Sequence, residues 1–302
     1  MSGTGGGCQT VTVGTTLERM AIADEAASVA DASAASAGVR VAELNSLEHL
    51  AAAATLFDTV WSQDNGSHMP LGLLRAISFS ENYVAGAFSG EELIGAVSGF
   101  RGGSAEEPHL HSHILGVLPD GRSRTVGYAL KHHQRAWALA HGLTSIVWTF
   151  DPLVAKNAYF NLTKLGAGAG NYMTNFYGKM DDAQNFGEES DRLVVHWRLE
   201  SPKAITASRG EPMAPNIEDL VSAGAAVVLD QDHRGYPTLN DSRDSILLFK
   251  LPSDIVKLRR DDPALGREWR VALRESFGAV LATGDYDISG AARSGCYVLH
   301  RS

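Results

Sequence analysis

The segment from Leu115 to Tyr128, LGVLPDGRSRTVGY, limits most strongly what this chain can fold into. An apolar stretch ends at Val117, a Pro-Asp-Gly turn follows, and a helical pattern begins after two arginines. This order predicts a strand, a loop and the start of a helix. Backbone N–H groups and the dipole at a helix start favour an anion. The segment therefore predicts a phosphate-binding loop with Arg122 and Arg124 at its mouth.

The charge pattern around this loop supports an anion site. From Gly121 to Phe150 the chain contains no Asp or Glu, although its net charge is −9. The basic residues of this window form a local island, which comprises Arg122, Arg124, Lys131 and Arg135, with His132 and His133.

The overall negative charge argues against a general nucleic-acid binder. No apolar run is long enough to span a bilayer, so we expect no membrane partner.

Composition and cysteine usage indicate a cytoplasmic globular protein. The chain has 302 residues, of which 44% are hydrophobic and 20% are charged, as is usual for soluble domains. Cys8 and Cys296 form neither a metal motif nor a disulfide framework, which is typical of a reducing compartment. We expect no metal site.

The chain is predicted to have four regions. They are a disordered or low-complexity tail over 1–37 with a short Ala-rich helix near 17–30, a mixed α/β domain over 38–200, a linker over 201–215, and a smaller α/β domain over 216–302.

Hydrophobic periodicity and turn signals predict the elements of both domains. In the first domain we expect strands over 39–43, 83–88, 93–100, 109–117, 144–149 and 192–199, and helices over 46–61, 71–80, 125–141 and 151–165. In the second we expect a helix over 217–223, strands over 225–229, 246–251, 286–288 and 296–301, and a helical stretch over 253–282 that is interrupted at 261–263.

The loop segment resembles the coenzyme-A loop of the GNAT superfamily of N-acyltransferases, which reads Arg/Gln-x-x-Gly-x-Gly/Ala after a strand ending in Val-x-Pro. In the preferred register the loop runs from Arg122 to Gly127, and Thr125 stands where the family has glycine. A second register, from Arg124 to Ala129, matches fully but begins two residues later. The resemblance implies that this segment binds acyl-CoA through Leu115, Gly116, Val117, Arg122, Ser123, Arg124, Thr125, Val126, Gly127 and Tyr128.

A second match follows in Trp148-Thr-Phe-Asp-Pro-Leu153 and Asn157-Ala-Tyr-Phe-Asn161. It is similar to a predicted-acetyltransferase subgroup, some members of which are linked to N-succinylamino acid metabolism. In GNAT enzymes this helix carries an asparagine beside the pantetheine arm, and here Asn157 takes that place. The family helix also carries a tyrosine that protonates the leaving thiolate. Leu162 occupies the tyrosine position, so the acid would have to be another tyrosine, which could be Tyr159, Tyr172 or the candidate that we name, Tyr177.

His109, His111 and His113 alternate along the strand that enters the loop, which places them on one face. The resemblance implies that this strand contacts the acceptor amine. Transfer to an amine needs a base, and imidazole has a suitable pKa. His111 and His113 are therefore the candidate bases. Solvated edge histidines are an equally open interpretation, whereas zinc would need a third and fourth ligand that no pattern supplies.

Asp151 and Arg192 are the candidate acceptor-binding residues. Asp151 also stands where it would cap a helix. The Arg192 guanidinium could bind a carboxylate of the acceptor or of a succinyl group in bidentate fashion. A surface ion pair with Asp191 is the alternative for Arg192.

The resemblance thus implies a GNAT-like α/β fold and an acyl-CoA-dependent N-acyltransferase. The donor would be acetyl-CoA or succinyl-CoA, and the acceptor the amine of a small metabolite such as an amino acid. A homodimer is left open. A non-catalytic acyl-CoA-binding or regulatory protein is the alternative, because Thr125 and Leu162 depart from the family pattern.

Overall fold

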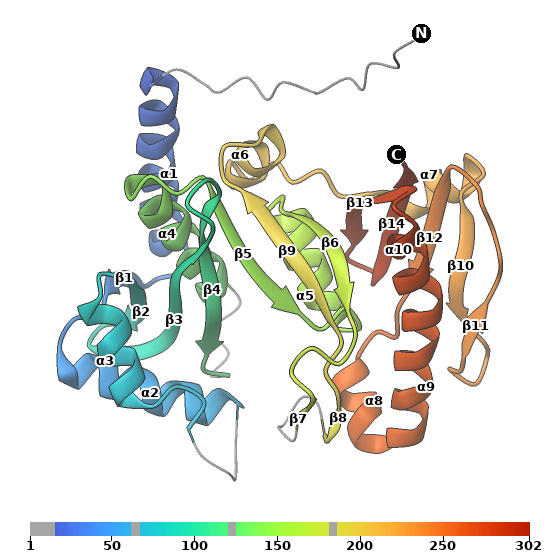
Figure 1. The fold of residues 1–302 in the computed structure, drawn as a ribbon, viewed down its shortest axis with the longest axis horizontal. Helices are drawn as coiled ribbons and strands as arrows, with labels where there is room; N and C mark the ends of the chain where they lie inside the picture. Colours follow the sequence, from blue (N-terminus) through green and yellow to red (C-terminus); the bar gives the residue numbers. More distant parts are fainter. Residues whose placement is uncertain (1–15, 62–66, 120–124, 181–185) are drawn as a thin grey trace, which may run out of the picture.

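The computed structural model describes residues 16–61, 67–119, 125–180 and 186–302. These residues form a mixed α/β structure with one seven-stranded sheet, one five-stranded sheet and a short two-stranded ribbon (Figure 1). The predicted α/β fold class is therefore confirmed.

The larger sheet has the strand order β1-β2-β3-β4-β5-β9-β6. Its β4–β5 pair is parallel and its other neighbours are antiparallel. The strands are β1 (Arg40–Glu43), β2 (Tyr83–Ser89), β3 (Glu92–Gly103), β4 (Pro108–Val117), β5 (Ser145–Phe150), β6 (Gly168–Met173) and β9 (Arg192–Arg198). The ribbon pairs β7 (Lys179–Met180) with β8 (Glu188–Glu189). Every predicted strand of this region is present, and β6, β7 and β8 are additional.

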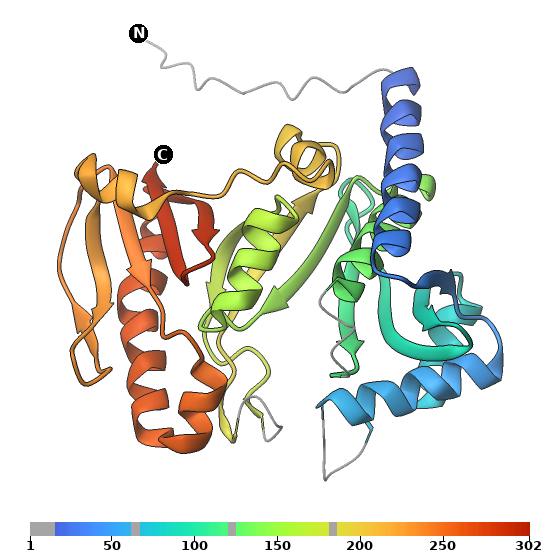
Figure 2. The ribbon, with the colours of Figure 1, turned by 180° about the vertical axis from the view of Figure 1, so that it is seen from behind.

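Helices cover both faces of the β1–β4 part of this sheet. On one face α2 (Leu47–Trp61) and α3 (Leu71–Phe79) bury Leu50, Phe57 and Leu74 against β2 and β3. On the other face α4 (Val126–Ala140) buries Val126 and Leu130. The predicted bounds of these helices are confirmed to within a residue or so. Figures 1 and 2 show β4 running between α2 and α4.

The Ala-rich helix predicted near 17–30 is confirmed and is longer than predicted, since Thr16–Ser36 form helix α1 beside α4. Ala26 and Ala30 are buried, and their small side chains allow a close approach of the two helices. Arg209 binds Glu25 of α1 through two nitrogens at 2.7 and 3.0 Å. Low sequence complexity did not prevent folding here because alanine favours helix and α4 supplies the packing surface. Residues 1–15 lie outside the described part.

The helix predicted after β5 is interrupted rather than regular. It consists of α5 (Ala155–Tyr159) followed by a π-helical turn, η1 (Phe160–Lys164). Asn161 is only 4% exposed. The Thr163 hydroxyl donates to the carbonyl oxygen of Ala291 at 2.7 Å. The helix is covered on both sides because the C-terminal part of the chain packs against it.

The smaller sheet belongs to the C-terminal part and has the strand order β11-β10-β12-β14-β13. Its strands are β10 (Ala226–Gln231), β11 (Pro237–Leu239), β12 (Ile246–Lys250), β13 (Tyr286–Ala292) and β14 (Cys296–Arg301). Its helical segments are α7 (Ile217–Ser222), α8 (Ile255–Asp261), α9 (Pro263–Leu273), the π-helical turn η2 (Arg274–Gly278) and α10 (Ala279–Thr283). The predicted linker contains a further helix, α6 (Pro202–Ser208), whose N-terminus is capped by the Ser201 hydroxyl.

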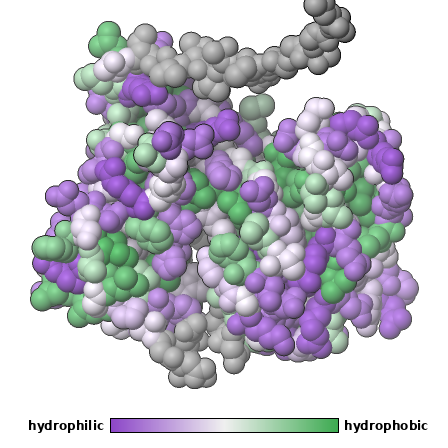
Figure 3. Space-filling view, viewed as in Figure 1, coloured by the Kyte–Doolittle hydropathy of each residue, from purple (hydrophilic) through white to green (hydrophobic). Residues whose placement is uncertain are grey.

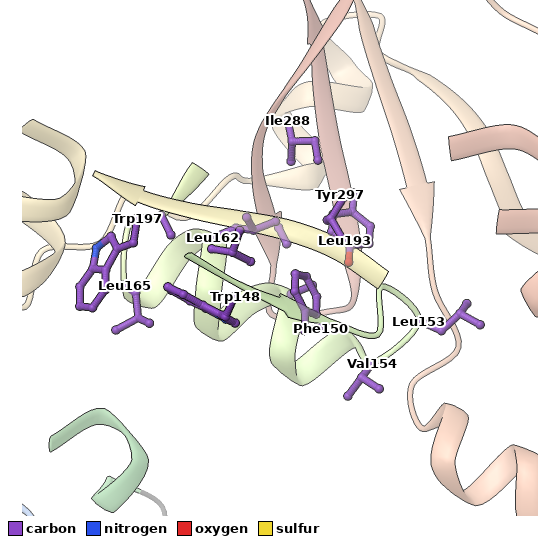
Figure 4. Close-up of a cluster of buried hydrophobic side chains, with 14 of the residues drawn as sticks. Trp148, Phe150, Leu153, Val154, Leu162, Leu165, Leu193, Trp197, Ile288 and Tyr297 are labelled. Carbon is purple, nitrogen blue, oxygen red and sulfur yellow. The ribbon is translucent and has the colours of Figure 1, made fainter. Parts of the chain in front are cut away.

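One hydrophobic core runs through both sheets. Phe150 and Leu193 of the larger sheet belong to the same buried cluster as Ile288 and Tyr297 of the smaller sheet (Figure 4). The Tyr297 hydroxyl donates to the carbonyl oxygen of Pro152 at 2.8 Å. The predicted boundary near residue 200 therefore does not separate two independent cores.

Buried ion pairs add to this contact at the end of β5. The Asp151 carboxylate accepts two hydrogen bonds from Arg270 of α9, both at 2.9 Å, and lies 2.8 Å from Nη1 of Arg259 in α8. Burial alone would raise the pKa of Asp151, but the charges of Arg270 and Arg259 outweigh it and hold this pKa well below its usual range. A carboxylate buried between two arginines leaves them uncompensated when it is removed.

We expect Asp151→Ala to lower the free energy of unfolding by about 3–5 kcal/mol, since it breaks a buried ion pair. Urea denaturation of the full chain measures this. Asp230→Ala is the matched control, because Asp230 pairs with Lys250 at the surface and such a pair contributes less than about 1 kcal/mol. Equal losses in the two variants would contradict the structural role of Asp151.

Candidate active site

The strands β4 and β5 separate in the middle of the larger sheet. Their parallel pairing includes Leu110–Ile146 and His111–Val147, whereas β4 continues to Val117 and β5 to Phe150. Figure 1 shows the two strands diverging below this point, and Figure 3 shows a narrow groove there between the lobe that carries α2 and the middle of the molecule. A divergence of paired strands opens backbone edges to a ligand.

A β-bulge lies beside this opening. On β3, Ser98 pairs with Ile114 of β4 and the next residue, Gly99, pairs with Ser112, so that His113 is the extra residue. Beyond the bulge the side chains of Leu115 and Val117 reach the α4 side. A Cβ placed on Gly127 would lie 3.8 and 3.9 Å from them. The first turn of α4 therefore packs directly on the end of β4.

The N-terminus of α4 lies where the sequence predicts a phosphate-binding loop. Thr125 is the N-cap residue, and its side chain makes no capping hydrogen bond. Val126 is fully buried, and Gly127 packs on β4. Three predicted coenzyme-A residues, Arg122, Ser123 and Arg124, lie outside the described residues. Tyr128 faces away from the opening, since its hydroxyl donates to the carbonyl oxygen of Ala207 at 3.3 Å.

The predicted basic island is not a surface feature over its whole length. Lys131, His132 and Arg135 are buried in α4. Arg135 donates two hydrogen bonds to the carbonyl oxygen of Leu199, at 2.8 and 3.2 Å. A sequence window does not show which face of a helix is buried, so these residues could not be separated from exposed cations. The Arg135 guanidinium is used in a contact within the protein, and burial lowers the pKa of His132 to about 3.

The candidate bases His111 and His113 do come together. Their ring centroids lie 6.1 Å apart, and each lies within 6 Å of the Phe100 ring of β3. Burial, followed by the charges of His113 and His109, lowers the pKa of His111 to about 4. Burial also lowers the pKa of His113. Both imidazoles are therefore neutral at pH 7 and able to accept a proton.

The candidate acid Tyr177 lies beside β5. Its hydroxyl is 3.3 Å from Oγ1 of Thr149, two residues beyond the last β4–β5 pair, and its side chain is 48% exposed. The other tyrosines are placed differently. Tyr172 donates its hydroxyl to Asp191 at 2.7 Å, and Tyr159 lies under the guanidinium of Arg293. Of these three, Tyr177 is the tyrosine that reaches the opening.

Asn157 and Leu162 lie on the segment after β5. Asn157 is partly exposed in α5, and Leu162 is fully buried in the core at the position of the family tyrosine. Leu162 points among Phe150, Leu193 and Tyr297 (Figure 4), so it serves packing.

The two predicted acceptor-binding residues are both occupied by protein contacts. Asp151 binds Arg270 and Arg259, and its Oδ1 also accepts a hydrogen bond from the backbone N–H of Leu153 at 3.0 Å. The predicted helix cap at Asp151 is wrong, because the helix begins at Ala155 with Val154 as its N-cap residue. Arg192 is buried, with Nη1 donating to the carbonyl oxygen of Asp191. Its guanidinium lies 5.4 Å from the ring of Tyr177. Arg192 therefore supports Tyr177, and Asp151 anchors the end of β5.

Among the residues that the structure describes, no group of three or more His, Cys, Asp or Glu side chains is arranged to hold a metal ion. Within the same residues, no helix has the length and apolarity needed to cross a bilayer.

Residues 47–165, which include β4, α4 and β5, match the family model described as acetyltransferase (GNAT) family. This segment is similar to GNAT acetyltransferase domains. The GNAT-like fold with an additional sheet in the C-terminal part, and the assignment to transferases that move acyl groups, are thereby confirmed. The match ends at Leu165, close to the point where the C-terminal part begins to cover the helix after β5.

Several solved structures are similar to the chain. Aminoglycoside 6′-acetyltransferase type Ii is 16% identical, with a TM-score of 0.44, over 54% of this chain and 98% of that one. YncA of Salmonella typhimurium, solved with its cofactor acetyl-CoA, is 14% identical, with a TM-score of 0.44, over 59% and 98%. An N-acetyltransferase from Staphylococcus aureus Mu50 is 14% identical, with a TM-score of 0.42, over 54% and 99%. No curated protein matches the sequence significantly.

The unusual pKa of His111 is directly measurable. We expect its imidazole to titrate at about pH 4 in the folded chain, against about 6.5 for an ordinary histidine, because burial penalises the charged ring. Histidine resonances followed by NMR against pH measure this, and His111→Gln identifies the signal. The pKa of His111 is lower in the folded chain than in the unfolded chain, so protonation of this ring favours unfolding. The free energy of unfolding therefore decreases as the pH falls below about 6.5. A His111 titration near 6.5 would contradict the burial argument.

Proposed function

We propose that the chain is an acyl-CoA-dependent N-acyltransferase that acts on the amine of a small metabolite such as an amino acid. The observation that carries the proposal is the separation of β4 and β5 inside the GNAT-type segment, next to the N-terminus of α4. The donor, acetyl-CoA or succinyl-CoA, would extend its thioester between the strands. Its diphosphate would lie at the start of α4, where N–H groups and the helix dipole favour anions.

The proposed chemistry uses groups from both sides of the opening. Backbone N–H groups near Leu115 to Val117 would polarise the thioester carbonyl, as in an oxyanion hole. His111 or His113 would accept the proton of the acceptor ammonium, directly or through water. The amine nitrogen then forms a bond to the carbonyl carbon and loses its second proton to water, the carbon–sulfur bond breaks, and Tyr177 would give its proton to the leaving thiolate. The phenolate regains a proton from solvent, which its exposure permits.

The alternative is a non-catalytic acyl-CoA-binding protein. The buried Leu162 at the family tyrosine position favours it, since this side chain can give no proton. Under this alternative, coenzyme A would raise the melting temperature of the chain by mass action, while acyl-CoA would release no thiol with any amine.

Thiol release from acetyl-CoA and succinyl-CoA across a panel of amino acids tests the catalytic roles. We expect His111→Gln and Tyr177→Phe each to lower kcat by about 10²- to 10⁴-fold, the usual contribution of a general base or acid. His300→Gln and Tyr159→Phe are the matched controls, because His300 is exposed on β14 and Tyr159 faces Arg293. Unchanged kcat in both site variants would refute the assigned roles. If the wild type binds acyl-CoA tightly but releases no thiol, the result would favour the non-catalytic alternative.

Calorimetry with coenzyme A tests the phosphate loop separately. We expect Arg122→Ala to weaken binding by about 10-fold or more, the effect of losing a charge-assisted hydrogen bond. Arg260→Ala is the control, since Arg260 pairs with Asp261 on the exposed side of α8. Equal affinities of the two variants would refute the loop assignment.

A further inference from the structure

The turn that carries Tyr177 lies on the surface of the molecule. It connects β6 to β7 over residues 174–178, and Phe176 and Tyr177 are 44% and 48% exposed. Asn175 has a φ of 48°, in the left-handed region that side chains rarely adopt. A short exposed turn with such a backbone keeps one conformation only when the surrounding structure holds it.

The segment that leads into β9 supplies this support. The Ser190 hydroxyl accepts a hydrogen bond from the backbone N–H of Tyr177 at 2.8 Å and donates to the carbonyl oxygen of Gly178 at 2.6 Å. Oδ1 of Asp191 accepts a hydrogen bond from the backbone N–H of Asn175 at 3.0 Å. The turn is therefore fastened on both sides of its centre to two neighbouring polar side chains.

Asp191 is itself held by Arg274 of η2. Its side chain is fully buried, and its carboxylate accepts two hydrogen bonds from the Arg274 guanidinium, at 3.0 and 2.7 Å. Burial would raise the pKa of Asp191, but hydrogen bonds from Arg274, Asn175 and Tyr172 outweigh it and lower this pKa. Without the arginine, the buried carboxylate would lose the cation that compensates its charge.

Arg274 reaches this carboxylate because η2 lies close to β6. A Cβ placed on Gly278 would lie 3.2 Å from Cδ1 of Tyr172, so a glycine permits the close approach. Arg274 also donates to the Glu189 carboxylate at 2.7 Å. The family match ends at Leu165, and the connection from η2 to the turn therefore belongs to the part of the chain that the family model does not cover.

We propose that Arg274 is a positioning residue for Tyr177. This inference rests on the proposed function, in which Tyr177 gives a proton to the leaving thiolate. A general acid must lie within hydrogen-bond reach of the atom that it protonates, and a displacement of about 1 Å can cost roughly 10²-fold in rate. Arg274 holds Asp191 in place, and Asp191 and Ser190 hold the turn. The C-terminal part of the chain thereby sets the geometry of the acid.

Thiol release from acetyl-CoA and succinyl-CoA across the panel of amino acids tests this inference on the full chain. We expect Arg274→Gln to lower kcat by about 10- to 100-fold, because the acid loses its fixed position. The KM for the thioester should not change, since the proposed donor contacts lie on β4 and α4. Arg209→Gln is the matched control, because Arg209 binds Glu25 through two nitrogens at the surface.

A double-mutant cycle separates positioning from a general loss of structure. In the Tyr177→Phe background no acid remains to be positioned, so adding Arg274→Gln should lower kcat no further. A merely structural role of Arg274 would lower kcat by the same factor in both backgrounds. Ser190→Ala breaks the connection next to Tyr177 without leaving a buried charge, and we expect the same pattern from it.

Hydrogen exchange of the turn gives a readout that does not depend on activity. In Arg274→Gln the backbone N–H groups of Asn175 and Tyr177 should exchange about 10-fold faster than in the wild type, because their acceptors are no longer held. The amides of β2 serve as the reference for any global change in stability. Arg209→Gln should leave the exchange of the turn unchanged.

The possible failures are distinguishable. If the turn exchanges no faster in Arg274→Gln, or if kcat falls by the same factor with and without Tyr177, the inference is wrong and the proposed function stands. If the turn exchanges faster while kcat stays unchanged in both Arg274→Gln and Tyr177→Phe, Tyr177 is not the acid and the inference fails with that assignment. A wild type that releases no thiol would overturn the proposed function and this inference together.

Discussion

The contact between Asp151 and the two arginines, Arg270 and Arg259, is the interaction on which the rest of this structure depends. Asp151 directly follows β5, so the ion pairs tie the end of that strand to α8 and α9. The end of β4 instead packs between α2 and α4, since Gly116 contacts α2 and Leu115 contacts Gly127 of α4. Beyond their last pair, His111–Val147, the two neighbouring strands are thus held by different parts of the molecule.

The C-terminal half is therefore part of the acyltransferase architecture rather than an attachment to it. It covers the helix after β5, shares the hydrophobic core and supplies the Tyr297 hydroxyl that binds Pro152. Leu162 belongs to the same arrangement, because a tyrosine at this position would have to place its hydroxyl in that core. The departure from the family pattern at Leu162 fits the presence of the second sheet, and Tyr177, the acid that we propose, lies outside the covered region.

Most strands and helices could be predicted because their signals are local. Each signal lies within a few residues of sequence. Apolar and polar residues alternate in β4, apolar residues recur at the helical period in α4, and a break precedes Pro263. The partners of Asp151 could not be predicted in this way, since Arg270 lies 119 residues away along the chain. The same holds for α1 and for the burial of Lys131, because composition shows neither which helix covers an alanine-rich segment nor which face of α4 meets the sheet.

One strand gives the candidate site two different environments. Before the bulge, residues of β4 alternate between the α4 side, where Ser112 meets the buried ammonium of Lys131, and the opposite side, where His111 stacks beside Phe100. Because the sheet lies between them, burial acts on the two groups separately. It lowers the pKa of Lys131 to about 7 on the α4 side and the pKa of His111 to about 4 on the opposite side. The thickness of one strand is thus enough to separate two basic groups that differ in the fraction of charge they carry at neutral pH.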